Sequence, residues 1–168
     1  MRWRDLKMSN WPGDAAVFPF CMPIIEQFEG FKAAPYKDSV GIATIGYGTI
    51  KYPDGKPVTM NDPAITEAQA TTFLSFEMSL KSKAIAPLLQ KPATLHQAAA
   101  MLSLAYNIGT GAFQDSTVLK KFNAGDIPGS ADAFLMWDKG TVNGQKVVID
   151  GLHNRRVAER SIFLTADN

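Results

Sequence analysis

Cysteine and histidine are scarce in this chain. Of its 168 residues, one is a cysteine, Cys21, and two are histidines, His96 and His153. A single cysteine cannot form an intrachain disulfide, and two distant histidines do not match the ligand spacing of a zinc site. The sequence therefore predicts neither a disulfide framework nor a metal centre.

The chain also lacks an excess of either charge and any long apolar run. It has 17 Lys+Arg against 16 Asp+Glu, a net charge of +1. Proteins that bind nucleic acid or anionic membranes usually carry a clear basic excess, so we expect neither partner. With no apolar run of membrane-spanning length and no apolar stretch typical of a signal peptide, we expect no integral membrane segment and synthesis in the cytoplasm.

The length suits a single domain with a sizeable core, since hydrophobic residues make up 46% of the chain. Residues 1–22 contain Trp3, Trp11 and several Pro and Gly without a periodic pattern, which predicts an irregular N-terminal arm. From Pro23 onward apolar residues recur at helical spacing up to Gly30, a typical helix stop. We therefore place the folded domain at residues 23–168.

Strand signals come early in the domain and helix signals come late. Residues 36–60 are rich in β-branched and aromatic residues, with a turn predicted at Asp54-Gly55. Capping boxes at Thr66 and Thr94 start two helices, and the helix at 94–108 is apolar nearly all round, as expected of a central core helix. Shorter helices are expected at 116–124, 130–137 and 152–164. The prediction is an α+β fold with a small antiparallel sheet.

Two carboxylates and a hydroxyl stand out in the early segment. Glu29 lies at a predicted helix end between phenylalanines, where the helix dipole and apolar neighbours disfavour ionisation. A hairpin turning about Gly41 would place Asp38 opposite Thr44, where Asp38 stays ionised. Glycoside cleavage needs such a pair, because one carboxyl protonates the leaving oxygen while the other stabilises the cationic sugar or activates water.

The segment that holds these residues resembles a known active-site motif. The run FEGFKAAPYKDSVGIATIGYGT is similar to that of phage-type lysozymes, the lambdoid endolysin family (glycoside hydrolase family 24), whose Glu, Asp and Thr fall on Glu29, Asp38 and Thr44. Two later blocks resemble the same family in the same order. They are residues 106–113 followed by 116–120, and residues 151–156 followed by Glu159.

The resemblance covers about residues 23–164 and implies a function. It implies a lysozyme-like fold in which a cleft separates a small sheet lobe from a larger helical lobe. It further implies hydrolysis of the β-1,4 bond between N-acetylmuramic acid and N-acetylglucosamine in peptidoglycan, with Glu29 as acid and Asp38 with Thr44 stabilising charge and positioning water. Tyr106, Asn107 and Ser116 would line the glycan cleft. We expect a monomer that needs no cofactor and reaches the cell wall or periplasm after release by a holin.

Two other functions and one structural alternative stay open. A lytic transglycosylase cleaves the same bond without water, although the Asp38 and Thr44 pair speaks against it. A non-catalytic peptidoglycan-binding module could keep the same fold. Arg155 and Arg156 could contact an anionic wall polymer, but Arg155 and Glu159 have the spacing of an ordinary helix ion pair, so both arginines are left out of the predicted site. Residues 137–150 form a longer connection than is usual in the family.

Overall fold

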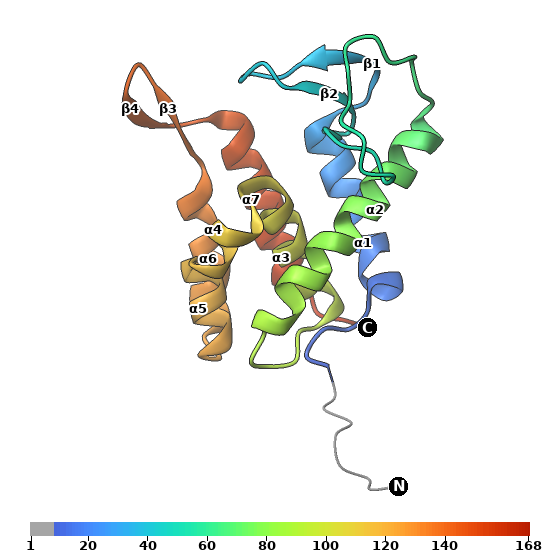
Figure 1. Ribbon diagram of the computed structural model, residues 1–168. Helices are drawn as coiled ribbons and strands as arrows, with labels where there is room; N and C mark the ends of the chain where they lie inside the picture. The colour runs from blue at the N-terminus through green and yellow to red at the C-terminus, as the bar shows by residue number, and fades with distance from the viewer. Residues whose placement is uncertain (1–8) are drawn as a thin grey trace, which may run out of the picture.

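The computed structural model describes residues 9–168 and has two lobes (Figure 1). The smaller lobe carries β1 (Lys32–Lys37), β2 (Ala43–Gly46) and the loops that follow them. The larger lobe is helical, and α2 (Glu67–Ile85) runs from the small lobe along its side. These lobes confirm the predicted α+β class.

The first helix begins earlier than the sequence predicted. α1 spans Asp14–Glu29 and includes Pro19, predicted to lie in the irregular arm, and Pro23, predicted to start the helix. Its apolar residues Val17 and Cys21 are buried together with Ile24 and Ile25, and this tertiary packing outweighs the disruption by proline. The prediction of an irregular arm was therefore wrong for residues 14–22, whereas the helix ends beside Gly30 as predicted.

Residues just before α1 dock on the helical lobe. The Trp11 side chain is buried and its indole N–H donates to Asp14 Oδ1 at 2.9 Å. Asn10 donates to the Leu89 carbonyl at 2.7 Å and accepts from the Ala93 amide. Trp3 lies outside the described residues. The described part of the predicted arm thus belongs to the folded body.

Both predicted capping boxes are present. The Thr66 and Thr94 hydroxyls accept from the amides of Gln69 and Gln97, so they start α2 and α3. The remaining helical elements, in chain order, are η1 (Ala86–Leu88), α3 (Leu95–Ile108), α4 (Thr110–Gln114), α5 (Thr117–Asn123), α6 (Ile127–Ala133), η2 (Phe134–Trp137) and α7 (Asp150–Phe163).

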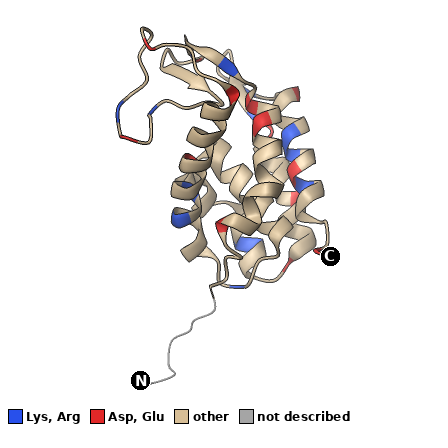
Figure 2. Ribbon diagram, turned by 90° about the vertical axis from the view of Figure 1, so that its right-hand side faces the viewer, with Lys and Arg blue, Asp and Glu red and all other residues tan. Residues whose placement is uncertain are grey.

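Helix α3 is the centre of the core. Its residues 98–105 are all buried, as the uniformly apolar sequence predicted. The helix packs against α1, far before it in the chain, and against α7, far after it. Figure 2 shows that the face drawn carries interspersed acidic and basic segments, in keeping with the small net charge.

The β1–β2 register differs from the prediction. Thr44 pairs with Tyr36, and the Asp38 amide donates to the Ile42 carbonyl at 3.0 Å. Gly41, at φ +86°, is the last residue of a three-residue loop and not its centre, because the positive φ is needed where the loop rejoins the strand. The prediction that Asp38 faces Thr44 directly was therefore wrong, and the two are diagonal neighbours on one face.

Two further turns complete the β structure. The Asp54-Gly55 turn forms as predicted, since the Gly55 amide donates to the Tyr52 carbonyl at 2.9 Å. A second hairpin, β3 (Lys139–Val142) and β4 (Gln145–Val148), was not predicted. No helix among residues 9–168 is both long enough and apolar enough to cross a membrane.

Candidate active site

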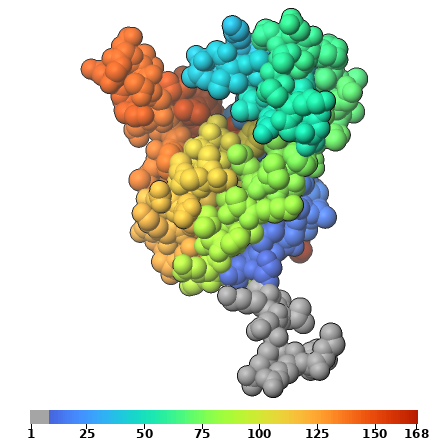
Figure 3. Space-filling model, viewed as in Figure 1, coloured from blue at the N-terminus to red at the C-terminus, as the bar shows by residue number. Residues whose placement is uncertain are grey.

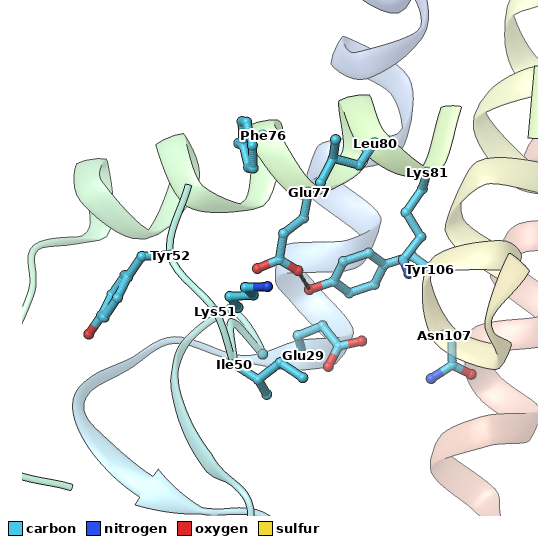
Figure 4. A pocket seen from close by; sticks show the side chains of 11 residues that line it. Glu29, Ile50, Lys51, Tyr52, Phe76, Glu77, Leu80, Lys81, Tyr106 and Asn107 are labelled. Atoms are coloured by element: carbon cyan, nitrogen blue, oxygen red, sulfur yellow. Dashed lines mark hydrogen bonds between the residues drawn. The ribbon is translucent and has the colours of Figure 1, made fainter. Parts of the chain in front are cut away.

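A cavity of about 440 Å³ lies between the loops of the small lobe and α2 (Figure 4). Three of the residues that the sequence singled out line it: Glu29, Tyr106 and Asn107. The other lining residues are Gly48, Ile50, Lys51, Tyr52, Phe76, Glu77, Leu80 and Lys81. The cavity thus combines carboxylates, lysines and apolar side chains, a mixture that suits a polar ligand with apolar ring faces.

Glu29 is the last residue of α1, and its side chain is 24% exposed. Its Oε1 accepts from Arg155 Nη1 at 2.6 Å. On the other side, a Cβ placed on Gly48 would lie 3.5 Å from Glu29 Oε2, so the glycine keeps this oxygen accessible to the cavity. The phenylalanines suggested apolar surroundings, but the structure places an arginine from the far end of the chain against the carboxylate.

Arg155 is held by further buried polar groups. Its Nε donates to Glu159 Oε1 at 3.2 Å, and its Nη2 donates to the Ser103 carbonyl at 3.4 Å. Glu159 is fully buried and also pairs with Arg156, whose Nη2 lies 3.0 Å from Glu159 Oε1. Two carboxylates and two guanidinium groups therefore balance one another beneath the cavity.

Burial works against both charges of this inner pair. It raises the pKa of Glu159, while Arg156 and Arg155 act to lower it. It lowers the pKa of the Arg156 guanidinium, while Glu159 acts to raise it. Because each charge compensates the other, loss of either partner would leave an uncompensated buried charge and destabilise the fold. Arg155 contacts Glu29 although the predicted site did not include it, and its spacing to Glu159 was the available signal.

Tyr106 and Glu77 form the second polar group of the cavity. The Tyr106 hydroxyl donates to the Tyr47 carbonyl at 2.9 Å and lies 3.4 Å from Glu77 Oε2. Burial raises the pKa of Glu77, against the opposing effect of the Thr49 and Tyr106 hydroxyls. Burial and the neighbouring charges of Glu77 and Glu29 raise the pKa of Tyr106. The sequence did not predict Glu77 as a site residue. The available signal was a charged residue among the residues of α2 that are buried.

Asp38 lies in the β1–β2 loop and does not line this cavity. Its Oδ1 accepts from the amides of Val40 and Ile42, each at 2.9 Å. Tyr36 lies near both Asp38 and Glu29. Burial raises the pKa of the Tyr36 phenol most, and the charges of Glu29 and Asp38 raise it further. Both carboxylates therefore lie within electrostatic reach of one tyrosine.

Thr44 and Ser116 have buried hydroxyls with backbone partners. Thr44 Oγ1 donates to the Ile42 carbonyl at 3.0 Å, on the strand next to Asp38. Ser116 is the N-cap of α5, where its hydroxyl accepts from the Leu119 amide at 3.2 Å. Its predicted place in the glycan cleft is not supported, because capping accounts for this buried side chain.

No group of three or more His, Cys, Asp or Glu side chains suited to a metal ion occurs among the described residues. The candidate site thus consists of three pairs of side chains. Glu29 and Arg155 lie at the base, Glu77 and Tyr106 on one wall, and Asp38 and Thr44 in the neighbouring hairpin.

The chain is similar to several known proteins. The family described as phage lysozyme matches residues 26–159. An endolysin of Acyrthosiphon pisum secondary endosymbiont phage 1 is 35% identical over 143 residues, which cover 85% of this chain and 94% of the relative. Among solved structures, an endolysin from the Escherichia coli phage FAHEc1 is 42% identical with a TM-score of 0.82, covering 88% of this chain and 92% of that one.

A third similarity is to the muramidase domain of SpmX from Asticaccaulis excentricus. It is 30% identical with a TM-score of 0.77, and the match covers 92% of this chain and 97% of that domain. The family match runs from within α1 to within α7, and the three carboxylates of the candidate site, Glu29, Asp38 and Glu77, fall within it. The chain belongs to the phage lysozyme family.

Proposed function

We propose that Glu29 is the general acid of a peptidoglycan-hydrolysing lysozyme of the endolysin type. Membership of the phage lysozyme family supports muramidase activity, the cleavage of the β-1,4 bond after N-acetylmuramic acid. The observation that carries the role of Glu29 is its position at the cavity, with one oxygen on Arg155 and the other beside Gly48.

Arg155 gives Glu29 both orientation and charge compensation. The 2.6 Å contact fixes Oε1, so the proton for the leaving oxygen would be delivered from Oε2 on the Gly48 side. Once the proton has left, the guanidinium stabilises the resulting carboxylate. General acid catalysis contributes about 10² to 10⁴ to the rate of such reactions.

Asp38 is the carboxylate that we assign to the developing positive charge of the sugar. Two backbone amides donate to its Oδ1, and its Oδ2 accepts no hydrogen bond from the described residues. Thr44 is its diagonal neighbour and can accept a hydrogen bond from the attacking water. Tyr106 and Asn107 are proposed to contact the glycan, since both line the cavity.

The experiment that tests this function is mass analysis of the fragments that the protein releases from purified peptidoglycan. The wild type is expected to give hydrated, reducing muramic acid ends. The Glu29→Gln variant keeps the side-chain volume and an acceptor for Arg155 but cannot donate the proton, so release should fall by about 10² or more. The thermal midpoints of the two proteins check that the fold is retained.

Two other outcomes would point to the alternative functions. Products with 1,6-anhydro ends would indicate a lytic transglycosylase, and binding without release by the wild type would indicate a peptidoglycan-binding module. The phage lysozyme match and the endolysin relatives do not favour either alternative.

We also propose that the protein acts as a monomer after synthesis in the bacterial cytoplasm and holin-dependent release to the cell wall. Sedimentation at micromolar concentration should give the mass of one chain. Lysis of an expressing culture should require co-expression of a holin, and lysis at the same time without it would contradict this route.

A further inference from the structure

The β3–β4 hairpin is a locally encoded, ordered ribbon. Its strands are joined by Asn143 and Gly144, which have φ values of 50° and 78°. Two consecutive positive φ angles are typical of the tight turn whose twist matches that of the flanking strands. Four consecutive residue pairs are then in register, from Val142 with Gln145 to Lys139 with Val148.

The base of the ribbon is fixed, but its faces are bare. The Asp138 carboxylate is buried and lies 2.9 Å from His153 Nδ1 of α7, and the Ile149 amide donates to the Asp138 carbonyl at 2.9 Å. Beyond this base every residue of the two strands is exposed except Gly140, and Val148 is 51% exposed. A two-stranded ribbon gains little stability in water by itself. The exposed faces of this one are therefore typical of a ligand-binding surface.

One face of the ribbon is basic. Residues paired directly across an antiparallel ladder share a face, so Lys139 and Val148 lie on the same side as Thr141 and Lys146. Residues 139–149 contain no Asp or Glu. Lys139 contacts the buried Asp138 at 3.3 Å, whereas Lys146 has no ion-pair partner among the described residues. The face therefore presents a lysine and a hydroxyl that can donate to an anionic ligand.

The ribbon stands beside the candidate active site. Figure 3 shows a hollow whose two rims are the β3–β4 hairpin and the small lobe, and Figure 1 shows the same two projections on either side of the helices. Helix α7 begins at Asp150, with one residue between it and the end of β4, and carries Arg155, which contacts Glu29. A polymer bound at Glu29 would therefore extend next to the hairpin.

We propose that the β3–β4 hairpin binds the peptide stems of peptidoglycan through its lysine-bearing face, while the cavity binds the glycan. This inference rests on the proposed function. Peptide stems carry carboxylates, which complement Lys146, and they are extended chains. Each strand of the ribbon also pairs on one side only, so its outer edge offers backbone donors and acceptors to an extended peptide.

The test compares hydrolysis of two substrates. Intact sacculi carry peptide stems, and glycan strands pretreated with an N-acetylmuramyl-L-alanine amidase do not. The Lys146→Glu variant should raise KM on sacculi about fivefold, the size expected of one exposed ion pair, with KM on stem-free glycan unchanged. The Lys120→Glu variant makes the same charge change on exposed Lys120 of α5 and should leave KM unchanged on both substrates.

The outcomes separate this inference from the proposed function. If Lys146→Glu changes KM equally on both substrates, or changes KM on neither substrate, the role of the hairpin is overturned. A wild type that cleaves neither substrate would overturn the proposed function instead. Thermal midpoints of both variants exclude loss of the fold as the cause.

A binding measurement tests the hairpin without catalysis. Titration of the full chain with a free stem tetrapeptide, followed by amide chemical shifts, should move the signals of residues 139–148. These shifts should be lost in Lys146→Glu and retained in Lys120→Glu. Unchanged hairpin signals in the wild type at millimolar peptide would overturn the proposal, whatever the activity on sacculi.

Discussion

Arg155 joins the two ends of the chain at the active site, because it links Glu29 of α1 to Glu159 of α7. Glu159 touches no part of the cavity, yet it holds Arg155 Nε at 3.2 Å and receives a hydrogen bond from Ser103 Oγ at 2.7 Å. Its effect on catalysis would pass through the orientation of Arg155, which makes Glu159 a positioning residue.

We expect Glu159→Gln to destabilise the protein strongly. The substitution leaves Arg155 and Arg156 without their buried negative partner, a change that typically costs about 3–5 kcal/mol. Chemical denaturation measures the loss of free energy of unfolding. The matched control on the same helix is Arg160→Gln, which removes a half-exposed ion pair with Asp132 and should cost at most about 1 kcal/mol. Equal losses in both variants would show that the buried network is not the stronger interaction.

Asp38→Asn separates the charge of Asp38 from its hydrogen bonds. The asparagine oxygen can still accept from the amides of Val40 and Ile42, so the loop and the thermal midpoint should be retained. Loss of the negative charge should lower kcat by more than about tenfold.

A matched control for this change lies in the second turn of the small lobe. Asp54 Oδ1 accepts from the Lys56 amide at 3.0 Å in the same manner, but Asp54 is not among the residues of the candidate site. Asp54→Asn should therefore leave kcat unchanged. Near-normal kcat in Asp38→Asn, measured on the same peptidoglycan, would remove Asp38 from the mechanism.

At the scale of elements, the loop from Tyr52 to Asp62 is closed by one side-chain cluster. The Tyr52 hydroxyl donates to Asp62 Oδ2 at 2.8 Å, and Thr59 donates to the same carboxylate. Burial and the hydrogen bond to Asp62 raise the pKa of Tyr52 to about 12. Tyr52 also lines the cavity, so this loop forms part of the wall of the site.

The raised pKa predicts a stability change at alkaline pH. The folded state favours the neutral phenol, so Tyr52 contributes its full stabilisation below about pH 10 and loses it as the pH rises to about 12. The difference in unfolding free energy between the wild type and Tyr52→Phe should shrink over this range. The phenolate absorbance should titrate with a midpoint of about 12 for Tyr52, and a midpoint near 10 would contradict the closed loop.

Local signals in the sequence predicted some elements and missed others for physical reasons. The capping boxes at Thr66 and Thr94 were correct because both partners of each hydrogen bond lie within one turn. The start of α1 was missed because tertiary burial of Val17 and Cys21 outweighs two prolines. The β3–β4 hairpin was missed although Asn143-Gly144 is a strong local turn signal.

The candidate site divides in the same way. Glu29, Tyr106 and Asn107 were found at the cavity because a family motif marked them. Arg155 reaches Glu29 across a separation of 126 residues, which no local pattern predicts. The β1–β2 register was wrong by the position of one glycine in the loop, since sequence alone did not show which loop residue takes the positive φ.

At the scale of the whole molecule, burial is greatest along α3 and low in β1 and the β3–β4 hairpin. Its residues 98–105 are buried between α1 and α7, while β1 and the β3–β4 hairpin are largely exposed. Amides in a buried central helix exchange with solvent only when the whole protein unfolds, whereas exposed ribbons open locally. The amount of buried surface therefore predicts a gradient of protection from α3 to the two hairpins.

Native-state hydrogen exchange measures this gradient. Amides of residues 99–105 should exchange with the free energy of global unfolding, and those of residues 141–147 should exchange several kcal/mol more easily. Adding a peptidoglycan fragment to the inactive Glu29→Gln protein should slow exchange in the β3–β4 hairpin and the small lobe, with little change in α3. The reason is that a ligand protects the segments that it contacts beyond the protection they have alone. Equal slowing throughout the molecule would mean that the ligand stabilises only the global fold, and that neither projection contacts the polymer.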